Sequence, residues 1–177
     1  MIISVNDTIN EIKINRSGGI ILNERYNAVL VVINRENRSF LQAKYGKNQC
    51  KLLEKWGPLK GHRKKNETIQ MCAMREIEEE SGLKIQINNL TPNLRVSDAV
   101  YYLFRIPDTV ELNPEDTKEI CDIQWKTFDE LLYLNKNRAL RCFIEYWSSF
   151  PENLKPLLPI RYPNTYNLSK NYMYLDI

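Results

Sequence analysis

The strongest constraint on the fold is a run of helix-forming residues from Glu67 to Ser81 that contains neither Gly nor Pro. Gly82 follows immediately, and glycine at that position commonly closes a helix in a left-handed conformation. The run therefore predicts a helix over residues 67–81. Strand-like runs lie on both sides of it and an amphipathic helix follows, so we expect an α/β domain built in layers.

Continuous β-branched and aromatic runs mark the strands that we expect. Residues 26–34 (YNAVLVVIN) are typical of a strand buried on both faces, and residues 38–44 are predicted to be its hairpin partner after a turn at residues 34–37. Gly and Pro residues predict a loop over residues 51–61. The remaining expected elements are strands over residues 83–88, 95–106 and 119–128 and helices over residues 128–134 and 138–150.

The length and composition are those of one globular domain. The chain has 177 residues, of which 43% are hydrophobic and 27% charged, and this excludes the disordered, collagenous and coiled-coil classes. We expect a single domain over residues 1–150. A Pro- and Tyr-rich extension over residues 151–177 is expected to pack on the domain or on a second subunit of a homodimer. The longest clean apolar run, residues 28–33, is too short to cross a bilayer, so no membrane segment is expected.

The cysteine pattern favours a reducing compartment. The four cysteines are scattered without CxxC spacing, and His62 is the only histidine, so we expect neither a structural zinc site nor a disulfide scaffold. We therefore expect reduced thiols in a cytoplasmic protein. The net charge of +3 allows a polyanionic partner without identifying one, and no DNA partner is expected.

Three glutamates share one face of the predicted helix. Glu76, Glu79 and Glu80 are spaced i, i+3 and i+4, which places them within an arc of roughly 100°. The neighbours of that arc are Ile69, Cys72 and Ala73, and the residues expected to point away are Met71, Met74, Glu78 and Ser81. The arc therefore turns inward, where crowded carboxylates are costly unless they bind a cation. Oxygen ligands of this kind select Mg²⁺ or Mn²⁺, and the alternative is a solvated acidic face.

The acidic face belongs to a longer pattern of spaced residues. The fixed positions are Gly61, Glu67, Arg75, Glu76, Glu79, Glu80 and Gly82, with aliphatic Ile77 and Leu83. They match without a gap the signature of the Nudix hydrolases, G-x5-E-x7-R-E-U-x-E-E-x-G-U, in which U is aliphatic. The chain therefore resembles that family, and the resemblance implies a Nudix α/β/α sandwich with a mixed sheet over most of residues 15–150.

The resemblance also implies a role for each signature residue. The implied metal ligands are Glu76, Glu79, Glu80 and the backbone carbonyl of Lys60. Arg75 would orient these carboxylates, and a surface ion pair with Glu79 is compatible with that role. Glu67 lies about 180° round an ideal helix from Glu76, so we assign it to stabilising the loop and the helix start. Gly61 would supply a tight loop and Gly82 a left-handed cap.

The implied reaction is hydrolysis of a pyrophosphate bond in a nucleoside diphosphate joined to a group X, by a water that the metal activates. Glu119 resembles the family's later acidic position and is expected to be the general base. Glu115, Asp116 and Glu76 are the alternatives, and the other interpretation of Glu119 is a solvated carboxylate at a strand edge. The rival function is a non-catalytic nucleotide- or RNA-binding module, which usually lacks some of the motif acids.

The segment before the signature bears on the substrate. Residues 55–67 (KWGPLKGHRKKNE) resemble the W-G-F-P-K-G-K stretch of the mRNA-decapping branch, including compact viral enzymes, although Pro58 and Leu59 replace its Phe-Pro order. The residues expected to contact substrate are Lys60, Arg63, Lys64 and Lys65, with Trp56 as a stacking residue. We therefore expect decapping of capped RNA with release of m7GDP. Small nucleotides, dinucleoside polyphosphates and diphosphoinositol polyphosphates are the alternative substrates.

Overall fold

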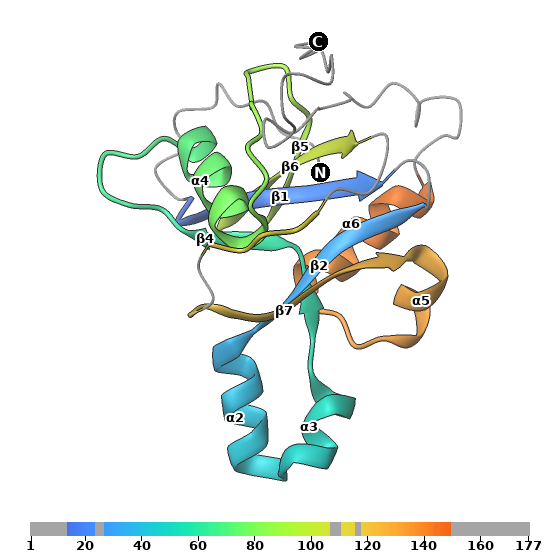
Figure 1. The fold of residues 1–177 in the computed structure, drawn as a ribbon. Helices are drawn as coiled ribbons and strands as arrows, with labels where there is room; N and C mark the ends of the chain where they lie inside the picture. Colours follow the sequence, from blue (N-terminus) through green and yellow to red (C-terminus); the bar gives the residue numbers. More distant parts are fainter. Residues whose placement is uncertain (1–13, 24–26, 107–110, 116–117, 150–177) are drawn as a thin grey trace.

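The structure is a computed structural model that describes residues 14–23, 27–106, 111–115 and 118–149. One sheet with helices on both sides forms the body of the molecule (Figure 1). The strands are β1 (Arg16–Asn23), β2 (Ala28–Asn34), β3 (Trp56–Gly57), β4 (Leu59–His62), β5 (Asn93–Val96), β6 (Ala99–Ile106) and β7 (Ile120–Thr127). The helices are α2 (Arg35–Tyr45), α3 (Lys47–Leu53), α4 (Ile69–Ser81), α5 (Phe128–Tyr133) and α6 (Arg138–Ser149). Within these described ranges no helix is long and apolar enough to span a membrane.

The sheet is mixed, as expected. Its strand order is β3-β2-β1-β6-β5, with β4 paired to β1 and β7 paired to β2. Strands β1 and β6 are parallel and the other pairs are antiparallel. The first half of β1 pairs with β4, and a Cβ added at Gly18 would lie 1.8 Å from the Leu59 carbonyl oxygen. Glycine at this position therefore allows the two strands that flank the site to approach closely.

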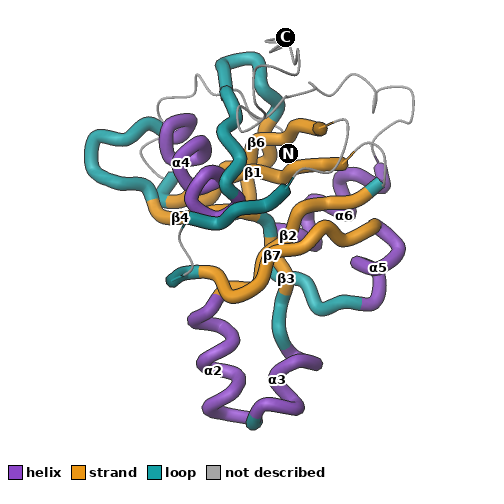
Figure 2. The backbone as a smooth tube through the Cα atoms, in the orientation of Figure 1, coloured by secondary structure: helices purple, strands orange, loops and turns teal. Residues whose placement is uncertain are grey.

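Two hydrophobic clusters cover the two faces of the sheet. On one face Ile21 of β1 packs with Ile77 of α4, and on the other Ile20 packs with Leu140 and Phe143 of α6. Neighbouring residues of β1 thus enter opposite clusters, because side chains alternate across a strand. Figure 2 shows α4 on one side of the strands and α5 and α6 on the other. The expected α/β/α sandwich is confirmed.

Helix α4 is the predicted motif helix with a slightly later start. Thr68 caps it by accepting a hydrogen bond from the Met71 amide, so Glu67 lies just before the helix. Two orientations were predicted wrongly, since Met74 packs against the hydrophobic core and Ser81 is buried rather than exposed. Ser81 is the polar one of the two. Its hydroxyl donates to the Ile77 carbonyl and accepts from the Leu83 amide, which lets a polar side chain turn inward at the helix end.

The predicted strand over residues 38–44 is wrong, because residues 35–45 form α2. Asn34, expected in a turn, caps this helix by accepting from the Asn37 amide. Only Leu41 within it is buried, whereas a strand would alternate buried and exposed residues. The loop expected over residues 51–61 is also wrong, since the end of α3 and strands β3 and β4 occupy it. Helices α2 and α3 form a hairpin that extends away from the sheet (Figure 1).

Two further strand predictions differ from the structure. Residues 83–88 form no strand, although Leu83, Ile85 and Ile87 alternate into the core as the pattern indicated. Residues 95–106 form parts of two strands, because Ser97 adopts a positive φ of 57° and reverses the chain between β5 and β6. The expected strands over residues 26–34 and 119–128 and both later helices are present. The extension over residues 151–177 and its expected packing lie outside the described residues.

Candidate active site

Two of the three motif glutamates are buried on the inward face of α4. Glu76 and Glu80 are each only 4% exposed, whereas the Glu79 side chain is 30% exposed and contacts Arg75. Met71 lies on the exposed side, as predicted. The expected inward turn of the acidic face is therefore confirmed for Glu76 and Glu80, and Glu79 lies at its edge.

A cluster of three carboxylates forms where α4 meets the start of β7. One ligand atom each from Glu76, Glu80 and Glu119 lies within 4.8 Å of the other two. Glu119 comes from the turn before Ile120 and is exposed, so it closes the cluster on its solvent side. The Lys60 amide of β4 donates to Glu80 at 3.2 Å and ties the cluster to the sheet. We call Glu76, Glu80 and Glu119 the acidic cluster.

Gly61 makes room for the Glu76 carboxylate. A Cβ at Gly61 would lie 2.0–2.1 Å from the carboxylate carbon and both oxygens of Glu76. Gly61 was expected to form a tight loop, but it lies in β4, and only Gly46 and Gly82 among the glycines have positive φ. Glycine is therefore required at position 61 because the Glu76 carboxylate lies too close to leave room for a side chain. The buried Oε2 of Glu76 has no hydrogen-bond partner in the structure, which leaves an acceptor for another ligand.

The Arg75 guanidinium binds Glu67 through one set of hydrogen bonds and the carboxylates of α4 through another. Its Nε and Nη2 donate to the two oxygens of Glu67 at 2.7 and 3.0 Å. Its Nη1 donates to Glu76 at 2.6 Å and to Glu79 at 3.1 Å. These bonds from Arg75, together with a hydrogen bond from the Lys64 amide, lower the pKa of Glu67 to about 2. Arg75 thus contacts two carboxylates of α4 and the Glu67 carboxylate of the preceding loop at once.

The C-terminal end of α4 contacts residues 113–115, which precede β7 in the chain. Gly82 has φ +80° and is the expected left-handed cap. A Cβ there would also lie 2.4 Å from the Asn113 carbonyl oxygen. The Glu115 amide donates to the Glu79 carbonyl at 2.9 Å, so Glu115 contacts this helix end through its backbone. Among the alternative bases, Glu115 is not part of the acidic cluster, and Asp116 lies outside the described residues.

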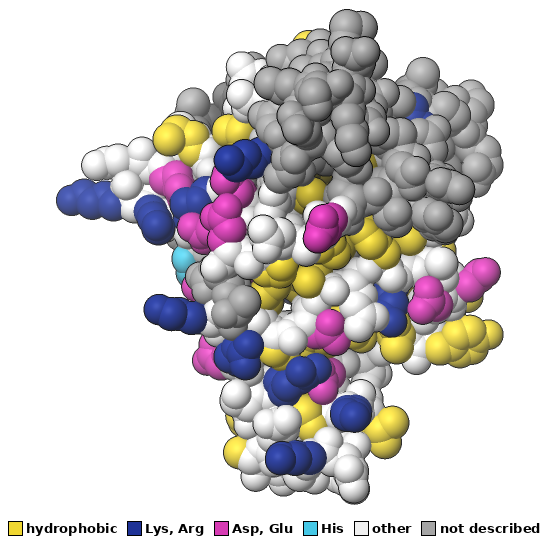
Figure 3. All heavy atoms as spheres, viewed as in Figure 1, with side chains coloured by type: hydrophobic (Ala, Val, Ile, Leu, Met, Phe, Trp, Pro, Cys, Tyr) yellow, Lys and Arg dark blue, Asp and Glu magenta, His cyan; other side chains and the backbone are white. Residues whose placement is uncertain are grey.

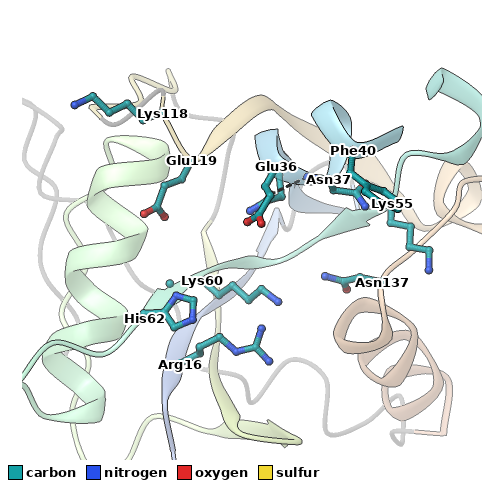
Figure 4. A pocket seen from close by; sticks show the side chains of 12 residues that line it. Arg16, Glu36, Asn37, Phe40, Lys55, Lys60, His62, Lys118, Glu119 and Asn137 are labelled. Carbon is teal, nitrogen blue, oxygen red and sulfur yellow. Dashed lines mark hydrogen bonds between the residues drawn. The ribbon is translucent and has the colours of Figure 1, made fainter. Parts of the chain in front are cut away.

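A cleft of about 690 Å³ opens beside the acidic cluster. Glu119 lies on one wall, and Lys60 and Arg16 extend side by side from the strands opposite (Figure 4). The Arg16 guanidinium is held by Asp98, with Nη2 donating to Oδ1 at 2.6 Å. Burial lowers the pKa of Lys60, and the neighbouring Arg16 charge lowers it further. Two adjacent cations on a wall favour a bound anion.

The other expected substrate contacts do not line this cleft. Arg63 donates to the backbone carbonyls of Glu67 at 2.6 Å and Ile14 at 3.4 Å, so it braces the loop. Lys64 and Lys65 are exposed and are not part of the cleft lining. Their positive charges belong to the outer surface of the loop.

Trp56 also has a different environment from the one expected. It lies in β3, packs against the hydrophobic cluster under α6, and has the Lys126 ammonium 5.4 Å from its ring centroid. It is not among the residues that line the cleft. Phe40 of α2 does line the cleft, together with Glu36 and Asn37. Sequence reasoning missed these residues because it assigned Glu36 and Asn37 to a turn and Phe40 to a strand. The helix-capping signal of Asn34 could have revealed α2.

The family assignment follows from this sequence pattern and fold. The sequence model of the NUDIX domain matches residues 24–147 of the chain. The chain belongs to the Nudix hydrolase family. As a Nudix hydrolase it acts on pyrophosphate bonds. The nucleoside triphosphatase NudI of Enterobacter sp. (strain 638) is 26% identical over 131 residues, which cover 66% of this chain and 93% of that protein.

Solved structures show the same fold. The MutT NUDIX hydrolase from Burkholderia pseudomallei superposes with a TM-score of 0.50 at 18% identity, covering 73% of this chain and 94% of that one. A NUDIX family hydrolase from Clostridium perfringens has a TM-score of 0.50 at 15% identity, covering 74% and 92%. At these identities the similarity establishes the Nudix fold alone.

Nudix hydrolases generally use divalent metals, and the acidic cluster fits such an ion. Burial raises the pKa of Glu76 to about 7 against the opposing contact with Arg75. Burial raises the pKa of Glu80 well above its ordinary range, and the charge of Glu76 adds to this. A hard cation would remove both costs, because it would neutralise the carboxylates and take the unpaired Oε2 of Glu76 as a ligand.

Proposed function

We propose that this Nudix hydrolase uses Mg²⁺ or Mn²⁺ to cleave the pyrophosphate bond of a nucleoside diphosphate joined to a group X. The observation that supports this best is that the acidic cluster reaches a cleft through Glu119, and that the opposite wall of this cleft carries Arg16 and Lys60. Carboxylates alone would repel a pyrophosphate, whereas this arrangement suits a cation and phosphates held side by side.

The motif residues would hold the cation. The proposed ligands are Glu76, Glu80, the Lys60 carbonyl and Glu79, whose 30% exposed side chain can turn from Arg75 toward the ion. Such a cation would neutralise charge on the phosphoryl oxygens and lower the pKa of the attacking water. Arg75 would keep the carboxylates of Glu76 and Glu79 in position through the bonds already described.

We assign the general base to Glu119. Its carboxylate belongs to the acidic cluster, lines the cleft and is exposed, so it reaches both the cation ligands and incoming water. In the proposed step the water oxygen bonds to phosphorus while Glu119 accepts one water proton. The bridging P–O bond breaks, and the released phosphate group takes the electron pair. Glu76 is the alternative base within the cluster.

For the group X we propose capped RNA, with release of m7GDP in the cytoplasm. Residues 35–55 of the α2–α3 hairpin hold six Lys and Arg residues and two Glu, although the whole chain has a net charge of only +3. Figure 3 shows several of the Lys and Arg side chains gathered over this hairpin. The hairpin adjoins the cleft through Phe40, so RNA leaving the cleft would meet these charges. Four free thiols support the proposed compartment.

Nucleoside triphosphates are the second candidate substrates. The similarity to NudI, a nucleoside triphosphatase, favours them. Dinucleoside polyphosphates and diphosphoinositol polyphosphates are further alternatives. A non-catalytic binding module is disfavoured because every acid of the motif is present.

The test measures product release from capped RNA, free cap analogue, nucleoside triphosphates and the two polyphosphate classes. Glu80→Gln should lose at least about 100-fold in kcat, because it removes a buried cation ligand. Glu78→Gln is the matched control, since Glu78 is on the same helix, pairs with Lys84 at 3.7 Å and lies outside the cluster. Equal activity of Glu80→Gln and wild type would overturn the catalytic site. Turnover of free nucleotides equal to that of capped RNA would overturn the RNA assignment.

A further inference from the structure

Phe40 presents an aromatic ring to the cleft instead of burying it. The side chain is 60% exposed, whereas its neighbour Leu41 is buried against the body of the protein. The Lys44 ammonium, one helical turn later, lies 5.7 Å from the ring centroid. An exposed aromatic ring in a cleft offers a flat apolar surface that water solvates poorly.

Asn37 lies one helical turn before Phe40 and also lines the cleft. Its amide Oδ1 is buried and has no hydrogen-bond partner in the structure, while its backbone amide donates to the cap residue Asn34. An unsatisfied buried acceptor costs free energy unless a ligand donates to it. Phe40 therefore offers a stacking surface to the cleft, and a turn of the Asn37 side chain on the same face of α2 would bring its buried acceptor to the same ligand.

The two ends of the cleft differ in chemistry. Arg16, Lys60 and Glu119 lie at the end next to the acidic cluster, and Phe40 and Asn37 lie at the α2 end (Figure 4). The volume of about 690 Å³ lies within the range of pockets that hold small organic ligands. A nucleotide with its phosphates at the cationic end would extend its base toward α2.

We propose that Phe40 and Asn37 form the nucleobase subsite of this enzyme. The base of the substrate nucleotide stacks on the Phe40 ring, and an N–H of the base donates to the Asn37 Oδ1. This inference rests on the proposed function in taking the substrate to be a nucleotide. It moves the stacking role from Trp56, which does not line the cleft, to a residue of the α2–α3 hairpin.

The experiment compares two ligands that share three phosphates and differ in the nucleoside. Binding of GTP and of inorganic triphosphate is measured by calorimetry in EDTA, where no divalent ion supports hydrolysis. Wild type should bind GTP more tightly than triphosphate. Phe40→Ala should weaken GTP binding about 10-fold, the order found for loss of one stacked base, and leave triphosphate binding unchanged. Phe40→Tyr should restore GTP binding.

The matched control is Tyr45→Ala, which removes the other exposed aromatic ring of α2, outside the cleft lining. It should bind both ligands as wild type does. As a second variant, Asn37→Ala should weaken GTP binding severalfold without affecting triphosphate. Thermal unfolding of each variant checks the fold, which loss of an exposed ring should leave intact.

Two results would overturn the subsite. One is equal GTP affinity in wild type and Phe40→Ala. The other is an equal loss of GTP and triphosphate binding, which would show a general disturbance of the phosphate end. Because binding is read without turnover, absence of hydrolysis on the whole substrate panel would contradict the proposed function alone. Conversely, active enzyme with unchanged GTP affinity in Phe40→Ala would contradict only the subsite.

Discussion

Replacing Gly61 with alanine would displace the Glu76 carboxylate without altering any charge. The added Cβ would lie 2.0–2.1 Å from three carboxylate atoms, whereas ordinary contacts begin near 3.4 Å. The carboxylate therefore has to move by about 1.4 Å for the van der Waals repulsion to be relieved. Such a shift changes the position of the Glu76 carboxylate relative to Glu80 and Glu119, whose ligand atoms lie within 4.8 Å of its own.

The effect on catalysis follows from that displacement. A misplacement of about 1 Å costs on the order of 100-fold in rate, which is about 2.7 kcal/mol of transition-state stabilisation. We expect Gly61→Ala to lower kcat/KM by about this factor. We also expect it to weaken Mn²⁺ binding at least about 10-fold, because a ligand is displaced. Calorimetric titration with Mn²⁺ and steady-state hydrolysis measure the two effects.

Gly46→Ala is the matched glycine control. Gly46 has φ +83° and open space around its Cβ position, so alanine there is strained without contacting the acidic cluster. It should lower the free energy of unfolding by about 1–3 kcal/mol and leave Mn²⁺ affinity unchanged. Wild-type Mn²⁺ affinity and kcat/KM in Gly61→Ala would refute the reasoning.

Three further predictions concern the surroundings of the site. Asp98→Asn should raise KM about 3- to 10-fold with little change in kcat, because Asp98 holds Arg16 at the cleft; an unchanged KM in initial-rate assays would contradict this. Bonds from Arg75 lower the pKa of Glu67 from 4.5 to about 2, so the pair stabilises the fold above pH 4.5 and the contribution is lost as pH falls toward 2. Urea unfolding between pH 2 and pH 7 should therefore show a steeper acid loss of stability in wild type than in Glu67→Gln, and parallel curves would count against it. Lys51→Glu should reduce the salt dependence of capped-RNA binding, by about 0.7 in the log–log slope for each phosphate that the hairpin no longer neutralises. Equal slopes for wild type and Lys51→Glu in a salt titration would show that Lys51 does not contact the RNA.

The motif helix could be predicted from the sequence because its determinants are local. Helix-forming residues, a Gly at the end and the spacing of Glu76 and Glu80 all act within a few residues of each other. The same spacing placed both glutamates on the inward face. The strand at residues 26–34 was equally readable, since a continuous β-branched run suits a strand buried on both faces.

Prediction of secondary structure from the local sequence pattern failed where the same residues fit both a helix and a strand, or a strand without a partner. The adjacent apolar residues Phe40 and Leu41 fit a short strand as well as a helix face, and the side-chain cap from Asn34 decided for the helix. Residues 83–88 alternate into the core like a strand, but no neighbouring strand pairs with them among the described residues. Backbone pairing depends on what lies alongside in space, which hydrophobic alternation does not encode.

The sequence by itself determined the family, the motif helix and the chemistry of its carboxylates, because these depend on residue type and short spacing. Only the tertiary structure decided which groups share the site. Pairing of β1 with β4 brings Arg16 beside Lys60, and the turn before β7 brings Glu119 to Glu76 and Glu80. The protrusion of α2 places Phe40 at the other end of the cleft. Such contacts join segments distant in the chain, so the packing of the sheet and helices sets them, and no local pattern encodes them.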